Sequence, residues 1–125
     1  PREQAVASQV KALDPDAFVL PPIQNLSYFL AVLNESELVV SGDTGPLHFA
    51  AGLGKKVIGL FAVKDGVEHY APIYQRDEVV LGKACTCTGE LVHLAVCKSL
   101  KPCMASISPE QVFELLKKRY PLDVN

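Results

Sequence analysis

The stretch VVSGDTGPLHFAAGLG, residues 39–54, decides the fold. An apolar run stops at Gly-Asp-Thr-Gly-Pro, and a segment rich in small residues then begins, with one histidine in its first turn. Because Pro46 suits the first turn of a helix and Gly54 suits the residue after its end, the pattern predicts a helix over about residues 45–53. The apolar run before it predicts a buried strand over about residues 37–41.

The other elements follow from apolar spacing and from capping residues. Helices are expected over residues 2–13, over residues 26–35 with Asn25 as N-cap, and after Ser108, which is an N-cap followed by Pro109 at the first helical position. Short apolar runs predict strands over residues 17–20, 56–61 and 78–81, with a long polar loop from Lys64 to about Asp77. Alternating helices and continuous apolar strands predict a parallel sheet covered on both faces.

The domain organisation follows from this order. We expect residues 1–125 to form a single α/β domain with a Rossmann-like, doubly wound parallel sheet. A doubly wound domain usually opens with a strand, whereas this chain opens with a helix. We therefore expect that a leading strand-helix-strand unit is missing and that the chain is a fragment of a longer protein.

The composition is that of a soluble globular domain. The chain has 125 residues, of which 49% are apolar and 21% charged, and its net charge is -2. There is no basic surplus to attract nucleic acid, and no apolar run approaches the ~20 residues that span a bilayer. The N-terminal stretch lacks the apolar core of a signal peptide. We expect a cytoplasmic protein with no nucleic-acid partner and no transmembrane segment.

The turn after residues 37–41 is a candidate anion site. Ligands of open parallel sheets bind beyond the carboxyl ends of the strands, and a helix N-terminus offers free N–H groups and partial positive charge. Gly45 allows close approach, while Thr44 and His48 share one face of the first turn and can donate to phosphate or ribose oxygens. Asp43 repels phosphate, so it caps the helix or accepts from ligand hydroxyl or amine groups. The alternative is a helix cap with no ligand.

The longer stretch SGDTGPLHFAAGLGKKVIGLF, residues 41–61, resembles the hallmark of the bacterial heptosyltransferases, glycosyltransferase family 9. The matching residues are Asp43, Thr44, Gly45, Pro46, His48, Ala50, Ala51, Leu53, Gly54 and residues 57–61. The preceding NLSYFLAVLNESELVVSG and the tail CKSLKPCMASISPEQVFELLKK are also similar to that family, so the resemblance covers about residues 20–119.

The resemblance implies the GT-B architecture, in which two Rossmann-like domains flank a cleft. It implies a transferase of lipopolysaccharide biosynthesis that moves heptose from a nucleotide diphosphate donor, typically ADP-heptose, onto the lipopolysaccharide core. This chain is similar to the C-terminal, donor-binding domain. By the resemblance, Asp43, Thr44, Gly45 and His48 match the positions that contact the donor.

The same resemblance implies that the general base and the acceptor site lie outside this chain. The general base is expected in the missing N-terminal domain, which also receives the lipopolysaccharide-type acceptor. We therefore expect no catalytic residue here, and no transfer activity from this piece alone. No metal and no cofactor are expected, because the nucleotide-sugar donor is a substrate. The bacterial protein is expected to be cytoplasmic and able to work at the inner face of the membrane.

The loop after residues 56–61 departs from the family pattern. The family usually continues with Gly-(Pro/Ser)-Thr, whereas this chain has Ala62-Val63-Lys64. Lys64 can serve as a point charge for the diphosphate, or it is simply solvated. The segment that contains His69 and Tyr70 loosely resembles the family's Pro-Tyr-Gly loop. We expect these two residues to be surface, packing or binding residues.

Two rival functions remain. The first is a non-catalytic nucleotide- or glycan-binding module that keeps the fold. The second makes Asp43 and His48 an acid-base pair in a small hydrolase. Their spacing of five argues against it, because residues five apart on a helix diverge and Asp43 precedes the helix.

The cysteines are confined to one segment. Cys85, Cys87, Cys97 and Cys103 have the spacing Cys-x-Cys-x9-Cys-x5-Cys, with His93 between them. Reduced structural thiols, a tetrahedral zinc site and disulfides all fit this spacing, although the paired Cys-x-x-Cys of strong zinc motifs is absent. Cys85 and Cys87 are not expected to pair with each other.

Overall fold

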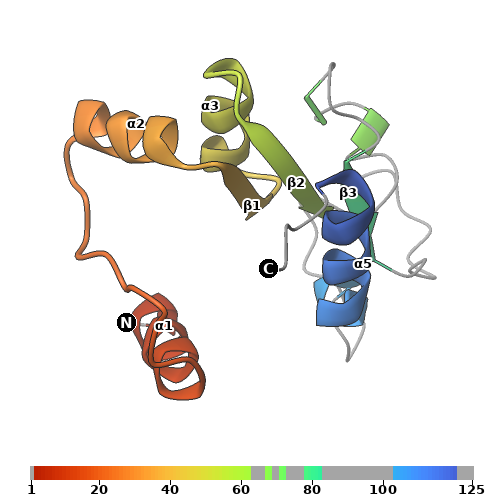
Figure 1. The fold of residues 1–125 in the computed structure, drawn as a ribbon, viewed down its shortest axis with the longest axis horizontal. Helices are drawn as coiled ribbons and strands as arrows, with labels where there is room; N and C mark the ends of the chain where they lie inside the picture. Colours follow the sequence, from red (N-terminus) through yellow and green to blue (C-terminus); the bar gives the residue numbers. More distant parts are fainter. Residues whose placement is uncertain (1, 63–66, 69–70, 73–77, 83–102, 121–125) are drawn as a thin grey trace. The chain divides into compact units, whose positions relative to one another are not determined.

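The computed structural model describes residues 2–62, 67–68, 71–72, 78–82 and 103–120. The chain divides into two compact units, Pro1–Ala31 and Val32–Asn125. Figure 1 labels the elements. They are α1 (Arg2–Leu13), α2 (Leu26–Glu35), β1 (Leu38–Gly42), α3 (Gly45–Gly52), β2 (Lys56–Phe61), β3 (Val79–Leu81), the 3-10 helix η2 (Cys103–Ser106) and α5 (Pro109–Arg119).

The first unit contains α1 and an extended segment that leads to α2. The helix predicted over residues 2–13 is confirmed. The strand predicted over residues 17–20 is wrong, because these residues form no strand and Phe18 is 81% exposed. A strand needs a neighbour with which to pair, and no other strand lies among the described residues of this unit. Pro21 and Pro22 also lack the N–H groups that would extend such a pairing.

The boundaries of α2 agree with the prediction from its cap. The N–H of Tyr28 donates to the side-chain oxygen Oδ1 of Asn25 at 3.1 Å, so Asn25 is the expected N-cap. The helix spans Leu26–Glu35, and Leu33 is buried. Local sequence therefore fixed both its start and its type.

A parallel sheet forms the centre of the second unit. Its strand order is β1-β2-β3, and both neighbouring pairs are parallel. Val40 lies opposite Ile58, and Leu60 lies opposite Val80. The three strands confirm the predicted α/β class with a parallel sheet, which is compatible with a fragment of a Rossmann-like fold.

The apolar core lies between α3 and the sheet. It consists of Leu47, Ala50, Val57, Phe61 and Ala71. Because strand residues alternate between faces, Val57 and Phe61 face α3, whereas Ile58 and Leu60 lie on the other face. Ile58 is also fully buried, so β2 is covered on both faces, as the continuous apolar run predicts.

The end of α3 is closed by a glycine in the left-handed conformation. Gly54 has a φ of 72°, and its N–H donates to the Ala51 carbonyl at 3.0 Å. The N–H of Lys55 donates to the Ala50 carbonyl at 3.0 Å. These two hydrogen bonds form a Schellman motif, which confirms the predicted role of Gly54.

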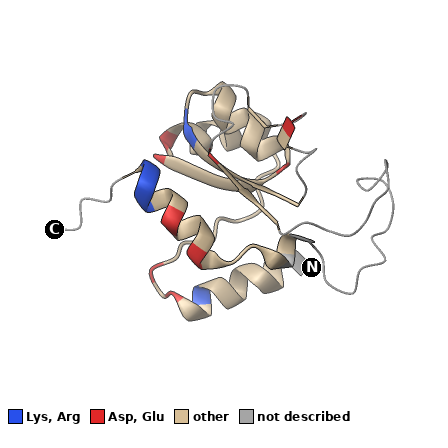
Figure 2. Cartoon of the chain, turned by 90° about the vertical axis from the view of Figure 1, so that its right-hand side faces the viewer, with Lys and Arg blue, Asp and Glu red and all other residues tan. Residues whose placement is uncertain are grey.

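A capping box begins α5. The Ser108 hydroxyl accepts from the Gln111 N–H at 3.3 Å, and the Ser108 N–H donates to Gln111 Oε1 at 2.7 Å. A backbone hydrogen bond and then one from the Ser108 hydroxyl lower the pKa of Glu110, in the first turn, below its ordinary value. The last turn holds Lys117, Lys118 and Arg119, which suit the negative end of the helix (Figure 2).

Tyr120, just after α5, ties the helix to the amino ends of two strands. Its hydroxyl donates to Glu78 Oε2 at 2.5 Å, immediately before β3. The Lys56 ammonium group lies 4.8 Å from the centre of the Tyr120 ring. Burial, and then the hydrogen bond to Glu78, raise the pKa of Tyr120 well above its ordinary value. These contacts explain how α5 is held beside β3.

Candidate functional site

The candidate site lies where β1 and β2 end. Gly42, the last residue of β1, lies opposite Leu60, and β2 ends one residue later at Phe61. Since the strands are parallel, the turn that begins at Asp43 and the loop that begins at Ala62 leave the same edge of the sheet. Lys64 lies outside the described residues, so its predicted contact with a ligand stays a prediction.

The turn into α3 leaves the helix N-terminus without a side-chain cap. Thr44 occupies the N-cap position with extended backbone angles, φ −146° and ψ 172°, but its side chain makes no cap hydrogen bond. Pro46 has no N–H, and the Leu47 N–H donates to the Thr44 carbonyl at 3.1 Å. Gly45 is the first helical residue and is exposed. At the start of α3, the exposed backbone that no side chain caps is therefore that of Gly45.

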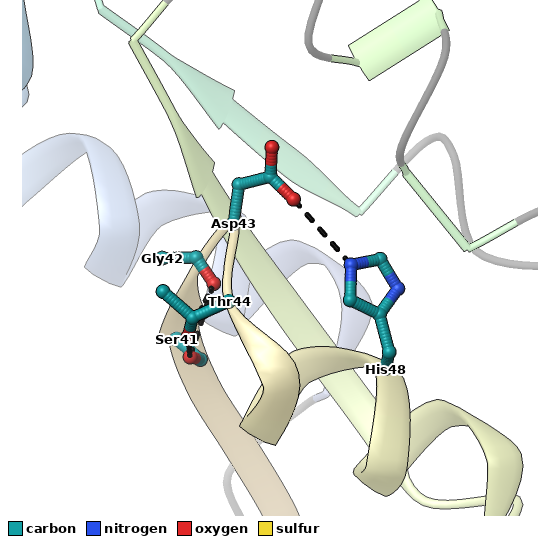
Figure 3. Close-up of polar contacts among 5 residues, drawn as sticks. All are labelled: Ser41, Gly42, Asp43, Thr44 and His48. Atoms are coloured by element: carbon teal, nitrogen blue, oxygen red, sulfur yellow. Dashed lines mark hydrogen bonds and ion pairs between the residues drawn. The ribbon is translucent and has the colours of Figure 1, made fainter. Parts of the chain in front are cut away.

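The Thr44 hydroxyl is held by the end of β1 rather than by the helix. It lies 3.4 Å from the Gly42 carbonyl, to which it donates, and 3.3 Å from the Ser41 hydroxyl (Figure 3). Ser41 in turn donates to the Gly42 carbonyl at 3.1 Å. Sequence reasoning missed Ser41, although a polar residue that ends an apolar run immediately before a Gly-Asp-Thr-Gly turn is a signal that could have indicated it.

Asp43 and His48 form a pair, which corrects two expectations. Asp43 Oδ1 lies 3.4 Å from His48 Nε2, and the two side chains are 35% and 44% exposed (Figure 3). The expectation that a spacing of five keeps them apart is wrong, because Asp43 lies in the turn and the helical period does not apply to it. The expectation that Asp43 caps α3 is also wrong, since its carboxylate faces the imidazole.

The four described site residues offer both donors and an acceptor. Thr44 and His48 carry side-chain donors at the positive end of α3, and Gly45 offers close backbone approach. Asp43 adds a carboxylate that can accept from hydroxyl or amine groups. All four are exposed. Such a set can hold an anionic group beside a hydroxyl-rich one.

The cysteine hypotheses fall almost entirely outside the described residues. Cys85, Cys87, His93 and Cys97 are not described, and Cys103 is described only as the start of η2. Among the residues that the structure describes, no cluster of three potential metal ligands occurs. Thiols, zinc and disulfides stay open as predictions.

The comparisons decide the family. The family model described as glycosyltransferase family 9 (heptosyltransferase) matches residues 1–100. The chain belongs to this family. Comparison with curated proteins and with solved structures gives no match.

Membership of glycosyltransferase family 9 implies glycosyltransferase activity in general, on a sugar donor and an acceptor. The matched residues include the whole turn from Gly42 to His48, so the family assignment and the candidate site concern the same part of the chain. Within the described ranges, no helix combines the length and the apolar character that crossing a bilayer requires.

Proposed function

We propose that this chain binds the nucleotide-sugar donor of a heptosyltransferase, with an ADP-heptose-type donor and a lipopolysaccharide core acceptor. The observation that carries the proposal is the uncapped start of α3 at the carboxyl edge of the sheet, with Thr44, Gly45 and His48 exposed around it. Membership of glycosyltransferase family 9 supports a sugar-nucleotide ligand at this edge.

Each site residue has a distinct role in this proposal. The Gly45 backbone and the positive end of α3 hold the diphosphate, and the Thr44 hydroxyl turns from the Gly42 carbonyl to donate to one of its oxygens. His48 adds a second side-chain contact, and Asp43 accepts from a hydroxyl group of the donor or from His48. Lys64 adds a point charge from the loop after β2. The site would act without metal or cofactor.

The proposed reaction is a direct displacement at the anomeric carbon. The bond from this carbon to the diphosphate oxygen breaks, and a bond to the acceptor oxygen forms. The acceptor proton passes to a base on a second, N-terminal domain, on the cytoplasmic side of the membrane. This chain holds the leaving diphosphate, whose growing negative charge is stabilised by preorganised N–H and O–H donors. It therefore lowers the barrier without supplying a bond-making group, and these 125 residues alone should show no transfer.

Calorimetric titration of ADP and ADP-heptose into the chain tests the proposal. Thr44→Ala combined with His48→Ala removes two side-chain hydrogen bonds to the ligand, each worth about 1–1.5 kcal/mol, so affinity should fall by about thirtyfold to a hundredfold. The matched control is Gln24→Ala combined with Ser27→Ala, two exposed polar residues outside β1, α3 and the turn that joins them. Equal affinity in the site variant and the control would refute the proposed site.

A second candidate is a non-catalytic nucleotide- or glycan-binding module. The observation that favours it is the sequence Ala62-Val63-Lys64, which replaces the family's usual Gly-(Pro/Ser)-Thr. A transfer assay on the full-length protein separates the two candidates. Donor binding accompanied by transfer supports the transferase, whereas donor binding without transfer, under conditions where a related transferase is active, supports the module.

A further inference from the structure

Asp43 and His48 approach each other from two different elements. Asp43 lies in the turn after β1, and His48 lies one helical turn beyond Thr44 on α3. Asp43 Oδ1 is 3.4 Å from His48 Nε2 (Figure 3), and neither side chain makes another hydrogen bond among the residues that the structure describes. The imidazole is therefore anchored at one defined nitrogen.

The contact is too weak to serve mainly as a source of stability. The distance of 3.4 Å between the two atoms exceeds that of a good hydrogen bond, and each of the two side chains is more than a third exposed. Exposed pairs of this kind contribute little to the free energy of unfolding. What the contact does define is which ring nitrogen faces the carboxylate.

The chemistry of the two groups fixes which nitrogen carries the proton. An ionised carboxylate only accepts hydrogen bonds, so Nε2 must carry an N–H when it faces Asp43. In the neutral imidazole the second nitrogen, Nδ1, is then a bare acceptor, and the partner of one ring nitrogen sets the state of the other. The carboxylate thus determines what His48 presents on its other side.

We propose that Asp43 is a positioning residue that holds His48 with its proton on Nε2 and leaves Nδ1 free for the sugar-nucleotide. The proposal rests on the proposed function for its ligand, but the proton position is a property of the free chain. Asp43 acts on the donor through His48. The charge of a carboxylate beside an anion site would by itself repel phosphate.

For the change in ADP affinity on removal of Asp43, the positioning role predicts the opposite sign from simple electrostatics. Removal of a negative charge beside a diphosphate should tighten binding if Asp43 acts only through its charge. If Asp43 positions His48, Asp43→Ala should weaken ADP binding by about threefold to tenfold, the usual size of a coupling between contacting residues. In a His48→Gln background the same change should no longer weaken binding. Asp43→Asn, which keeps an acceptor oxygen and loses the charge, should bind at least as well as the native chain.

The test combines nitrogen NMR with this mutant cycle, both on the full chain. Long-range ¹H–¹⁵N spectra at a pH where imidazole is neutral report the two ring nitrogens of each histidine, and His48→Gln assigns the signals of His48. The native chain should show one protonated Nε2 and one bare Nδ1, and Asp43→Ala should move the two shifts toward each other. Unchanged shifts in Asp43→Ala would overturn the positioning role.

The ADP affinities of the variants provide a second, independent test. Tighter ADP binding in Asp43→Ala, equal in both backgrounds, would also overturn the positioning role. If the native chain binds no ADP but its nitrogen shifts respond to Asp43→Ala as expected, the proposed function fails while the control of the His48 proton by Asp43 is supported.

Discussion

Replacement of Gly59 by alanine tests how α3 is seated on the sheet. Gly59 is buried in the middle of β2. A methyl group at this position would lie 2.7 Å from Phe61 Cε2 and 3.3 Å from Leu47 Cδ2. Phe61 and Leu47 are 1% and 0% exposed, so neither side chain can give way without disturbing the core.

The expected change in the free energy of unfolding is the difference between two opposing effects of the added methyl group. Overpacking of a well-packed core costs about 1–3 kcal/mol. The loss of glycine from a strand recovers about 0.5–1 kcal/mol, mainly through the smaller entropy of the unfolded chain. Because the closest approach is shorter than any ordinary carbon contact, we expect Gly59→Ala to lower the free energy of unfolding by about 1–2 kcal/mol.

Urea unfolding followed by circular dichroism measures this difference, with Gly52→Ala as the matched control. Gly52 lies at the end of α3, and an added methyl group there would meet nothing within 4 Å. We expect Gly52→Ala to raise the free energy of unfolding by about 0.5–1 kcal/mol. If Gly59→Ala proves as stable as Gly52→Ala, α3 does not pack on β2 as described.

Three further predictions concern helix ends and the contact of α5 with the sheet. Gly54→Ala should cost about 1–2 kcal/mol, because only glycine adopts its φ of 72° without strain; an unchanged urea midpoint would exclude this conformation. Ser108→Ala should cost about 1 kcal/mol through loss of the capping box, whereas Ser108→Thr should retain most of the stability; equal losses in both would argue against the cap. Tyr120→Phe should cost about 1.5 kcal/mol at pH 7, since a hydrogen bond to the Glu78 carboxylate is lost. Because the pKa of Tyr120 is raised in the folded chain, its contribution is full below the ordinary tyrosine value of about 10 and is lost as the pH rises through the folded value. The native chain should therefore lose more stability than Tyr120→Phe as the pH is raised above about 10, and parallel losses would contradict the contact.

Local signals predicted the helix ends well. Asn25, Gly54 and Ser108 each act on backbone groups within a few residues, so their roles can be inferred from a short stretch of sequence. The parallel order of β1 and β2 was also predictable, because a helix with its own start and stop signals lies between two continuous apolar runs.

Non-local features were not predictable in this way. The apolar run at residues 17–20 satisfies the pattern of a strand, but pairing depends on a neighbour that no local pattern supplies. The contact between Asp43 and His48 depends on the path of the turn, which places Asp43 outside the helical period that was applied to it. Tyr120 reaches Glu78 across more than 40 positions of sequence, and apolar spacing contains no information on such a contact.

The central claim is that the start of α3 holds the diphosphate of a nucleotide donor. The most direct measurement is a titration of the ¹⁵N-labelled chain with ADP, followed by ¹H–¹⁵N correlation spectra, with adenosine as the control ligand. We predict the largest amide shifts at Thr44, Gly45, Leu47 and His48, and much smaller shifts there with adenosine, which lacks the phosphates. Shifts confined to the opposite edge of the sheet, around Lys56 and Glu78, or equal shifts with both ligands, would contradict the claim.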